Sequence, residues 1–222
     1  MNSPADQLKH SYDSIASDYA LVYSESLQYK AFDQKILDHF AALAPEGNLC
    51  DLGCGPGTVT SHLAGKSRKI IGADFSRMMV ETARSQNPEI DFFCENALGT
   101  NFKDESFTGL TALGLIQHYD FNSINFLFKE AFRLLKPGGI YLLNYYVGQG
   151  SLFVSDFLNQ EAPMNYYFYK KEEIHKALTT QGFLIDIFLE RESYKDFELN
   201  QSVGFVFARK TTAEKTKPGQ AP

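Results

Sequence analysis

Residues 51–57, with the sequence DLGCGPG, constrain the fold more than any other segment of this chain. They follow a short apolar run, residues 49–52, that is typical of a buried strand, and they precede a predicted helix over residues 58–64. The alternating glycines let the backbone turn sharply and let a ligand approach main-chain atoms; they are Gly53, Gly55 and Gly57. In an open α/β sheet, ligands bind at the end of the strand where such a turn lies.

Short apolar runs alternate with helical patterns along the rest of the chain. Strands are predicted over residues 49–52, 69–73, 91–94, 109–116, 140–146, 183–189 and 203–208. Helical periodicity occurs over residues 8–19, 32–43, 76–85, 124–135 and 172–181. We therefore expect an α/β fold, a doubly wound Rossmann-like domain with a mostly parallel seven-stranded sheet. The last two strands are separated by about a dozen residues, which is short for a helical crossover, so we expect an antiparallel C-terminal pair.

The pattern predicts a single domain over residues 1–210. Residues 1–45 would form an N-terminal helical cover. Residues 147–170 are rich in Phe and Tyr without regular periodicity, and we interpret them as an irregular lid insertion beside the site. Residues 211–222, with two prolines and a glycine, are expected to be a disordered tail.

The composition indicates which class of partner to expect and in which compartment the protein is expected to work. The chain of 222 residues carries a formal net charge of −6 and no dense Lys/Arg cluster, so nucleic acid is not an expected partner. Its 3 cysteines form no disulfide framework, which predicts a reduced, cytoplasmic protein. No signal peptide is recognisable at the N-terminus, and no apolar stretch approaches the roughly 20 residues that a membrane span needs.

Two nucleotide-binding motifs compete for the glycine turn. A dinucleotide fingerprint needs G-x-G-x-x-G, but the third glycine position is taken by Thr58. A P-loop is excluded because no Gly-Lys-Ser/Thr follows. Asp74 ends the second predicted strand, where a carboxylate can accept two hydrogen bonds from a ribose diol. Asp74 could also cap the next helix, but its distance from the glycine turn favours the ligand role.

Four segments in this order resemble the class I S-adenosylmethionine-dependent methyltransferases. LCDLGCGPGTVTSHLA resembles the family's glycine turn, and GADFSRMMVETAR resembles its ribose-binding segment. FKDESFTGLTALGLIQHY is similar to the fourth-strand region, where Thr108 stands in place of the usual acid. EAFRLLKPGGIYLLNYY is similar to the following helix, turn and fifth strand. YDSIASDYA and FYKKEEIHKALTTQGF are weaker matches near the two ends of the chain.

The resemblance implies a set of cofactor-binding residues. Asp74 would hold the ribose hydroxyls, Phe75 and Met79 would border the adenine, and Asp51 would orient the ammonium group. Asn96, beside Ala97, stands where the family usually has an acid that meets the adenine amino group. Leu115 would pack beside the cofactor. The implied set is Tyr12, Tyr19, Asp51, Gly53, Gly55, Gly57, Asp74, Phe75, Met79, Asn96, Ala97 and Leu115.

Several of these residues also have ordinary structural interpretations. Tyr12 and Tyr19 lie on an apolar helical stripe, so packing explains them as well as a place over the cofactor does. His118 follows the fourth strand and is the candidate catalytic base, although it could be a structural histidine. The candidates for an acceptor pocket are Tyr145, Tyr146, Tyr166 and Tyr167. No His lies at metal-ligand spacing from the cysteines, so we expect no metal.

The implied activity is transfer of a methyl group from S-adenosyl-L-methionine to a small molecule by in-line displacement, with S-adenosyl-L-homocysteine as product. The short, acidic chain without a further recognition domain favours a small-molecule acceptor. Three alternatives stay open. The chain could methylate protein or RNA, it could bind S-adenosylmethionine without catalysis, or it could be a nicotinamide enzyme.

Overall fold

A computed structural model of the protein describes residues 4–66 and 68–212. Two helices, α1 (Pro4–Tyr23) and α2 (Ala31–Leu43), precede the alternating part of the chain, with a 3-10 turn η1 (Ser26–Tyr29) between them. The following elements are β1 (Leu49–Leu52), α3 (Thr58–Ala64), β2 (Ile70–Asp74), α4 (Arg77–Gln86), β3 (Phe92–Cys94), β4 (Phe107–Ala112), η2 (Ile116–His118), α5 (Phe121–Leu134), β5 (Leu135–Val147), β6 (Gly150–Phe157), β7 (Gln160–Tyr169), α6 (Lys171–Thr180), β8 (Phe183–Arg191) and β9 (Val203–Lys210). Residues 213–222 of the predicted disordered tail lie outside the described residues.

The predicted doubly wound sheet is confirmed. Strands β3, β2, β1, β4 and β5 lie side by side and run parallel. β9 continues the sheet antiparallel to β5, and β8 pairs antiparallel with β9. The late strand pair is therefore antiparallel, as the short connection between its strands predicts. Parallel strands joined by helices put all their carboxyl ends at one edge, and this edge forms the site.

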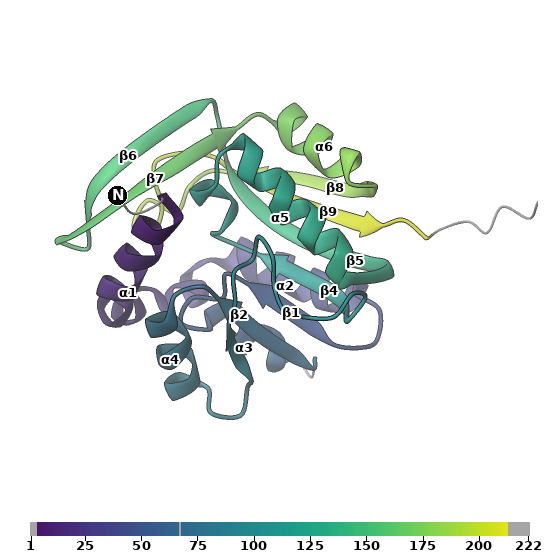
Figure 1. Cartoon of the computed structure of the whole chain (residues 1–222), viewed down its shortest axis with the longest axis horizontal. Coiled ribbons are helices and arrows are strands. Elements are labelled where there is room, and N and C mark those ends of the chain that lie inside the picture. Colours follow the sequence, from purple (N-terminus) through teal and green to yellow (C-terminus); the bar gives the residue numbers. More distant parts are fainter. Residues whose placement is uncertain (1–3, 67, 213–222) are drawn as a thin grey trace, which may run out of the picture.

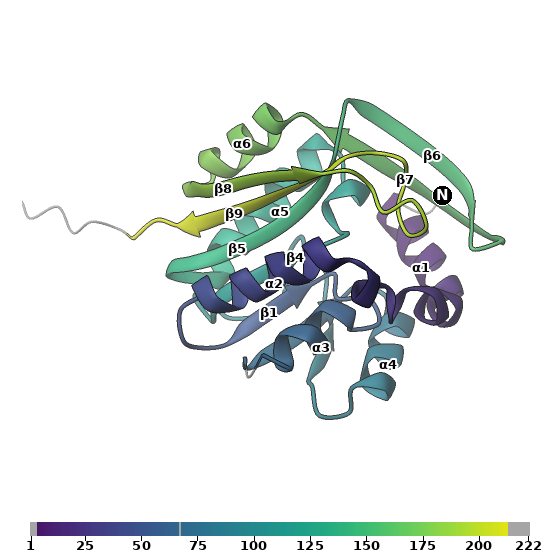
Figure 2. The ribbon, with the colours of Figure 1, turned by 180° about the vertical axis from the view of Figure 1, so that it is seen from behind.

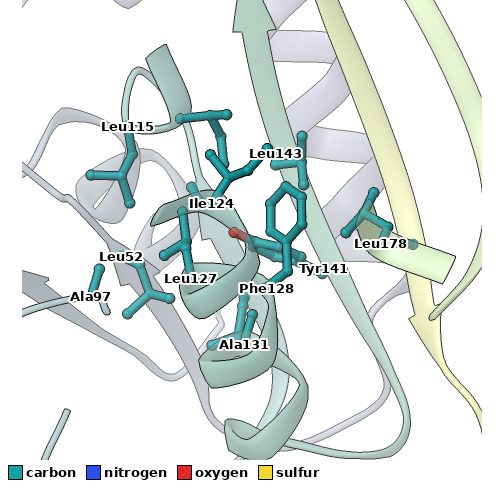
Figure 3. Close-up of a cluster of buried hydrophobic side chains, with 14 of the residues drawn as sticks. Leu52, Ala97, Leu115, Ile124, Leu127, Phe128, Ala131, Tyr141, Leu143 and Leu178 are labelled. Carbon is teal, nitrogen blue, oxygen red and sulfur yellow. The ribbon is translucent and has the colours of Figure 1, made fainter. Parts of the chain in front are cut away.

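Apolar side chains fill both faces of the sheet. On one face, α2 and α3 contribute Leu37, Phe40 and Leu63 to a cluster that also holds Phe205 and Phe207 of β9. On the other face, α5 covers β5 and α6 packs against β8 and α5, and Phe128, Tyr141 and Leu178 lie in the cluster there (Figure 3). The helix α5 has its apolar stripe where the sequence predicts it, and Asp120 caps its N-terminus by accepting a hydrogen bond from the Ser123 backbone at 2.8 Å. The two packed faces hold the sheet, and hence its carboxyl edge, in place.

The prediction that residues 147–170 are irregular is wrong. They form an antiparallel hairpin of β6 and β7, so the sheet has nine strands where the sequence predicts seven. The hairpin turn is the pair Leu158-Asn159, with φ of 54° and 60°. Turns of two residues with positive φ are usually marked by Gly, and the absence of that signal explains the wrong prediction.

Two strand boundaries also differ from the prediction. β4 ends at Ala112, and residues 116–118, where the sequence predicts the end of the strand and the residues after it, form η2. β5 begins at Leu135, five residues earlier than predicted, because Leu135 already pairs with Phe107 of β4, ahead of a register shift. The early end of β4 places His118 on a turn above the sheet edge.

The hairpin and α1 lie together over the carboxyl edge of the sheet. β7 pairs with only the last two residues of β5, Tyr146 and Val147, so the hairpin extends past the main sheet. In both views it reaches out beside α1 (Figures 1 and 2). Ser11 of α1 donates a hydrogen bond to the Pro163 carbonyl of β7 at 2.8 Å. Within the described part of the chain, every helix is too short or too polar to span a bilayer.

Candidate active site

A cavity of about 390 Å³ lies at the carboxyl edge of the sheet. Its floor is formed by the ends of β1, β2, β4 and β5, and its cover by α1, the β6–β7 hairpin and the loop between β8 and β9. The residues on which the site is built are Tyr12, Tyr19, Tyr23, Asp51, Gly53, Gly55, Asp74, Phe75, Met79, Leu115, His118, Tyr146, Phe157, Tyr166 and Glu198. The cavity is therefore where both the glycine turn and the aromatic lid predict a ligand.

The glycine turn has the backbone that its sequence predicts. Gly53, Gly55 and Gly57 have φ of 71°, 51° and 91°, in the left-handed region that favours glycine. A Cβ on Gly53 would approach Leu115 to 2.7 Å, so glycine is required there for packing. A Cβ on Gly55 would have no heavy atom within 4 Å. Gly55 lines the cavity, so its missing side chain leaves room for a ligand against the backbone.

Asp74 is held at the end of β2 by two backbone donors. Its Oδ2 accepts from the Gly55 N–H at 2.9 Å, and its Oδ1 accepts from the Ser76 N–H at 2.8 Å. The side chain is buried but lines the cavity, and each oxygen keeps a further acceptor position. Burial raises the pKa of Asp74 to about 6, against the effect of the two backbone hydrogen bonds. A ligand with hydroxyl or cationic groups would stabilise the ionised carboxylate.

Asp51 is held in the same way by two hydroxyl groups. Thr111 of β4 donates to its Oδ1 and Thr60 of α3 donates to its Oδ2, both at 2.7 Å. Burial raises the pKa of Asp51 to about 6, although the two threonine hydrogen bonds lower it. Asp51 and Asp74 thus place two carboxylates on the floor of one cavity, and no basic side chain is bonded to either of them among the described residues.

Tyr12 and His118 form a hydrogen-bonded pair in the cover of the cavity. The Tyr12 hydroxyl lies 2.7 Å from Nε2 of His118, and the His118 Nδ1 lies 3.3 Å from the Asn165 carbonyl oxygen. A carbonyl oxygen can only accept, so Nδ1 carries the hydrogen, Nε2 is the acceptor, and the Tyr12 hydroxyl donates. Burial lowers the pKa of His118 to about 4 and raises that of Tyr12. At neutral pH both groups are therefore uncharged, and the pair has a defined direction.

The helix α1 is anchored beside the cofactor-binding turn. The Asp13 Oδ1 accepts from the Ser76 hydroxyl at 2.6 Å and from the Met78 N–H at 3.2 Å, at the N-terminus of α4. Ser76 also caps α4, as predicted, by accepting from the Met79 N–H. These contacts keep Tyr12, the residue next to Asp13, and Tyr19, six residues further along α1 than Asp13, over Asp74 and Phe75.

Most residues predicted for the cofactor site and the acceptor pocket line this cavity, and four do not. Those that line it are Tyr12, Tyr19, Asp51, Gly53, Gly55, Asp74, Phe75, Met79, Leu115 and His118, with Tyr145, Tyr146 and Tyr166 of the predicted acceptor pocket. Gly57, Asn96, Ala97 and Tyr167 are not among the lining residues. Asn96 is exposed, and its Oδ1 accepts from the Leu98 N–H at 2.9 Å, so its contact with adenine stays a prediction.

Five residues that line the acceptor side of the cavity were not predicted from the sequence. Tyr23 continues the α1 stripe by one further turn, a signal that was available. Phe157 comes from the unrecognised hairpin. Glu198 is far in the sequence from Lys30 and Asp33, and nothing in the local patterns shows that these charged residues converge. Among the described residues, no group of three or more His, Cys, Asp or Glu side chains is placed to hold a metal ion.

The sequence and the fold are both similar to known methyltransferases. Residues 49–139 match a family described as a methyltransferase domain. A demethylmenaquinone methyltransferase from Lactococcus lactis is 32% identical over 148 residues, which are 60% of this chain and 56% of that protein. A putative methyltransferase from Bacillus subtilis is 30% identical over 135 residues, which are 59% and 55% of the two chains. The chain thus spans little more than half the length of these relatives.

Solved structures share the fold. A methyltransferase from Methanosarcina mazei superposes with a TM-score of 0.70 at 23% identity, over 79% of this chain and 97% of that one. The magnesium protoporphyrin IX methyltransferase of Synechocystis PCC 6803, solved with its bound methyl donor, gives a TM-score of 0.71 at 17% identity, over 95% and 99%. At these identities the likeness concerns the fold alone.

Proposed function

We propose that the chain is a class I S-adenosylmethionine-dependent methyltransferase and that it transfers the methyl group of S-adenosylmethionine to a small-molecule acceptor. The observation that carries the proposal is the contact between the glycine turn and Asp74. The Gly55 N–H orients the Asp74 carboxylate at 2.9 Å, beside the open space that the missing Gly55 side chain leaves.

The residues present fit the cofactor. The two free acceptor positions of Asp74 suit a ribose diol, which offers two donors. Asp51 supplies a second buried carboxylate for the ammonium group. Tyr12 and Tyr19 lie above, with uncharged phenols that suit an apolar cover over a cationic ligand. Phe75 and Met79 provide apolar surface for the base.

The proposed reaction requires little from the protein beyond alignment of the methyl donor with the acceptor. The sulfonium already activates the methyl group, so S-adenosylmethionine supplies the electrophile when it is bound. The cavity under α1 and the hairpin has room to align donor and acceptor. Alignment of two reactants can lower a barrier by roughly 7–11 kcal/mol. His118 is a neutral base that reaches the cavity through the Tyr12 hydroxyl.

A small molecule is favoured as acceptor by the cover of the site. The acceptor side is closed by Tyr23 of α1, Phe157 of the hairpin and Phe197 of the β8–β9 loop. Apolar walls with a few polar groups are typical of small-ligand pockets.

Calorimetric titration with S-adenosylmethionine and S-adenosylhomocysteine tests the cofactor. We expect micromolar binding that weakens at least tenfold in Asp74→Asn, because the amide cannot accept both ribose hydrogen bonds. Asp186→Asn is the matched control, since Asp186 pairs with Arg209 on the outer strand pair. Absence of binding to either ligand by the unaltered protein would overturn the proposal. Bound cofactor without methyl transfer to any acceptor would instead favour a non-catalytic binding protein.

A further inference from the structure

The acceptor side of the cavity is lined by four tyrosines, Tyr19, Tyr23, Tyr146 and Tyr166, which we call the tyrosine wall. The rings of Tyr19 and Tyr23 have centroids 4.4 Å apart, and those of Tyr146 and Tyr166 are 6.3 Å apart. Burial raises the pKa of each of these phenols, so all four stay protonated. Flat apolar faces with hydroxyl groups favour a flat aromatic ligand that has hydrogen-bonding groups of its own.

The largely buried charged groups beside the tyrosine wall, Lys30, Asp33 and Glu198, are already paired. The Lys30 Nζ lies 3.0 Å from Glu198 Oε1. Arg191, behind the wall, donates to both Asp33 oxygens at 2.6 and 2.7 Å and to both Glu198 oxygens at 2.7 and 2.8 Å. The other charged residues on the acceptor side, Lys195 and Asp196, are both exposed to solvent, away from the buried pairs.

At the tyrosine wall this pairing disfavours both anionic and cationic acceptors. A phosphate or carboxylate would need a cation that is not already bonded, and an ammonium would need a free carboxylate. Separating a buried pair to provide either leaves an uncompensated charge, which is strongly unfavourable. The acceptor side therefore suits an uncharged molecule.

The Tyr12–His118 pair indicates which atom accepts the methyl group. A hydroxyl proton becomes strongly acidic as its oxygen gains a methyl group, so even a weak base can take it during the reaction. His118, whose pKa burial lowers to about 4, is such a base. An aliphatic amine that gains a methyl group keeps its proton as an ammonium with a pKa of about 10, and His118 could not remove it. The pair therefore favours an O–H acceptor over an N–H acceptor.

We propose that the acceptor is an uncharged aromatic molecule with a free hydroxyl group, and that the hydroxyl oxygen is methylated. This rests on the proposed function. The acceptor oxygen forms the new bond to the methyl carbon while the sulfur–methyl bond breaks and sulfur keeps the electron pair. The hydroxyl proton passes to the Tyr12 oxygen as the Tyr12 proton passes to Nε2 of His118, and the imidazolium then releases it to water. The products are the aryl methyl ether and S-adenosylhomocysteine.

Three naphthalenes that differ in one substituent test the acceptor class. We would titrate 2-naphthol, 2-naphthoate and 2-(aminomethyl)naphthalene into the protein saturated with S-adenosylhomocysteine and follow naphthalene fluorescence. We expect 2-naphthol to bind at least tenfold more tightly than the other two, and to give its methyl ether, detected by mass spectrometry, with S-adenosylmethionine. Equal or tighter binding of the anion or the amine would overturn the proposal, as would methylation of the amine or no binding of 2-naphthol.

Two variants test the proton path. Tyr12→Phe keeps the ring but removes the relay, and His118→Gln keeps an acceptor for the Tyr12 hydroxyl but is no base. We expect both to lower kcat for 2-naphthol by about 10²–10⁴-fold with little change in 2-naphthol binding. Tyr29→Phe, at an exposed tyrosine outside the cavity, should leave kcat unchanged. Unchanged kcat in both site variants would overturn the relay.

The binding experiments separate failure of the proposed function from failure of the acceptor class. If S-adenosylhomocysteine itself does not bind, the proposed function fails. If S-adenosylhomocysteine binds but the naphthalenes give the contrary result, only the acceptor class fails.

Discussion

Two buried carboxylates at the floor of the cavity set how the site responds to pH. Asp51 and Asp74 both have a pKa raised to about 6 by burial. Each is held by two hydrogen-bond donors that carry no formal charge, so neither has a cation to offset the loss of water. The groups therefore change charge just below neutral pH, where a cationic cofactor needs them ionised.

The affinity for S-adenosylhomocysteine should fall as the solution is acidified. Below pH 6 each carboxylate must lose a proton before it can bind the ligand, at a cost of up to about tenfold in affinity per pH unit for each group. Above pH 7 both are ionised, and the affinity should be constant. Titration calorimetry between pH 5 and 8 measures this, and Asp74→Asn should flatten the slope by removing one of the two groups. An affinity independent of pH in the unaltered protein would contradict the assignment.

Alanine variants at Gly55 and Gly138 can distinguish the effect of backbone strain from the effect of ligand contact. Both have positive φ, 51° and 79°, and a Cβ on either would meet no heavy atom closer than 4.0 Å. Alanine at each should destabilise the protein by about 1–2 kcal/mol through the left-handed backbone. Only Gly55→Ala places its methyl group in the cavity, so it alone should weaken S-adenosylhomocysteine at least tenfold. Thermal unfolding and calorimetry on both variants provide the test, and equal affinities would show that Gly55 does not face the ligand.

At the scale of elements, the β6–β7 hairpin holds the helix α1 over the site. The ring of Phe157, at the end of β6, stacks on Tyr23 with centroids 6.2 Å apart, and lies 6.3 Å from that of Tyr19. Gln160, the first residue of β7, donates a hydrogen bond to Asp18. The hairpin thus contacts the helix along the face that carries the phenols of the site, and its stability should affect how firmly α1 is placed.

Loss of the Phe157 ring should loosen α1 without affecting the main sheet. In Phe157→Ala we expect faster hydrogen exchange over residues 4–23 and unchanged exchange in β1 and β4, because the sheet is stabilised by other clusters. Phe153→Ala is the matched control on the same strand, since the Phe153 side chain is 60% exposed. Similar exchange of α1 in both variants would mean that the hairpin tip does not anchor the helix.

The elements that local patterns define were predictable, and the cover of the site was only partly so. The glycine turn, Asp51 and Asp74 are close in sequence and follow buried strands, so their convergence follows from the parallel sheet. The hairpin was missed because Leu158-Asn159 carries no glycine at its turn. The link between Tyr12 and His118 joins residues 106 positions apart, and no periodicity in either segment predicts it. Each residue was recognisable as a candidate, but the hydrogen bond between them was not.

At the scale of the whole molecule, Arg191 joins the two ends of the chain beside the cavity. It lies at the end of β8 and bonds to Asp33 of α2 and to Glu198 of the β8–β9 loop. Burial alone would lower the pKa of Arg191, but the hydrogen bonds to Glu198 and Asp33 raise it above its ordinary value. The guanidinium also packs 4.3 Å from the Tyr194 ring centre. This group holds the loop that carries Phe197 and Leu199 against the N-terminal helices.

Removal of the Arg191 charge should therefore destabilise the whole domain. Arg191→Met leaves two carboxylates buried, with only Lys30 beside them. Breaking a buried pair in this way lowers the free energy of unfolding by about 3–5 kcal/mol. In a chain of this size, each kcal/mol lowers Tm by about 2–4 °C. Arg209→Met, which removes a half-exposed ion pair with Asp186, should cost no more than about 1 kcal/mol. If the cost comes from uncompensated charge, adding Asp33→Asn and Glu198→Gln to Arg191→Met should restore part of the lost stability. A triple variant less stable than Arg191→Met would show instead that the hydrogen bonds and packing around the carboxylates dominate.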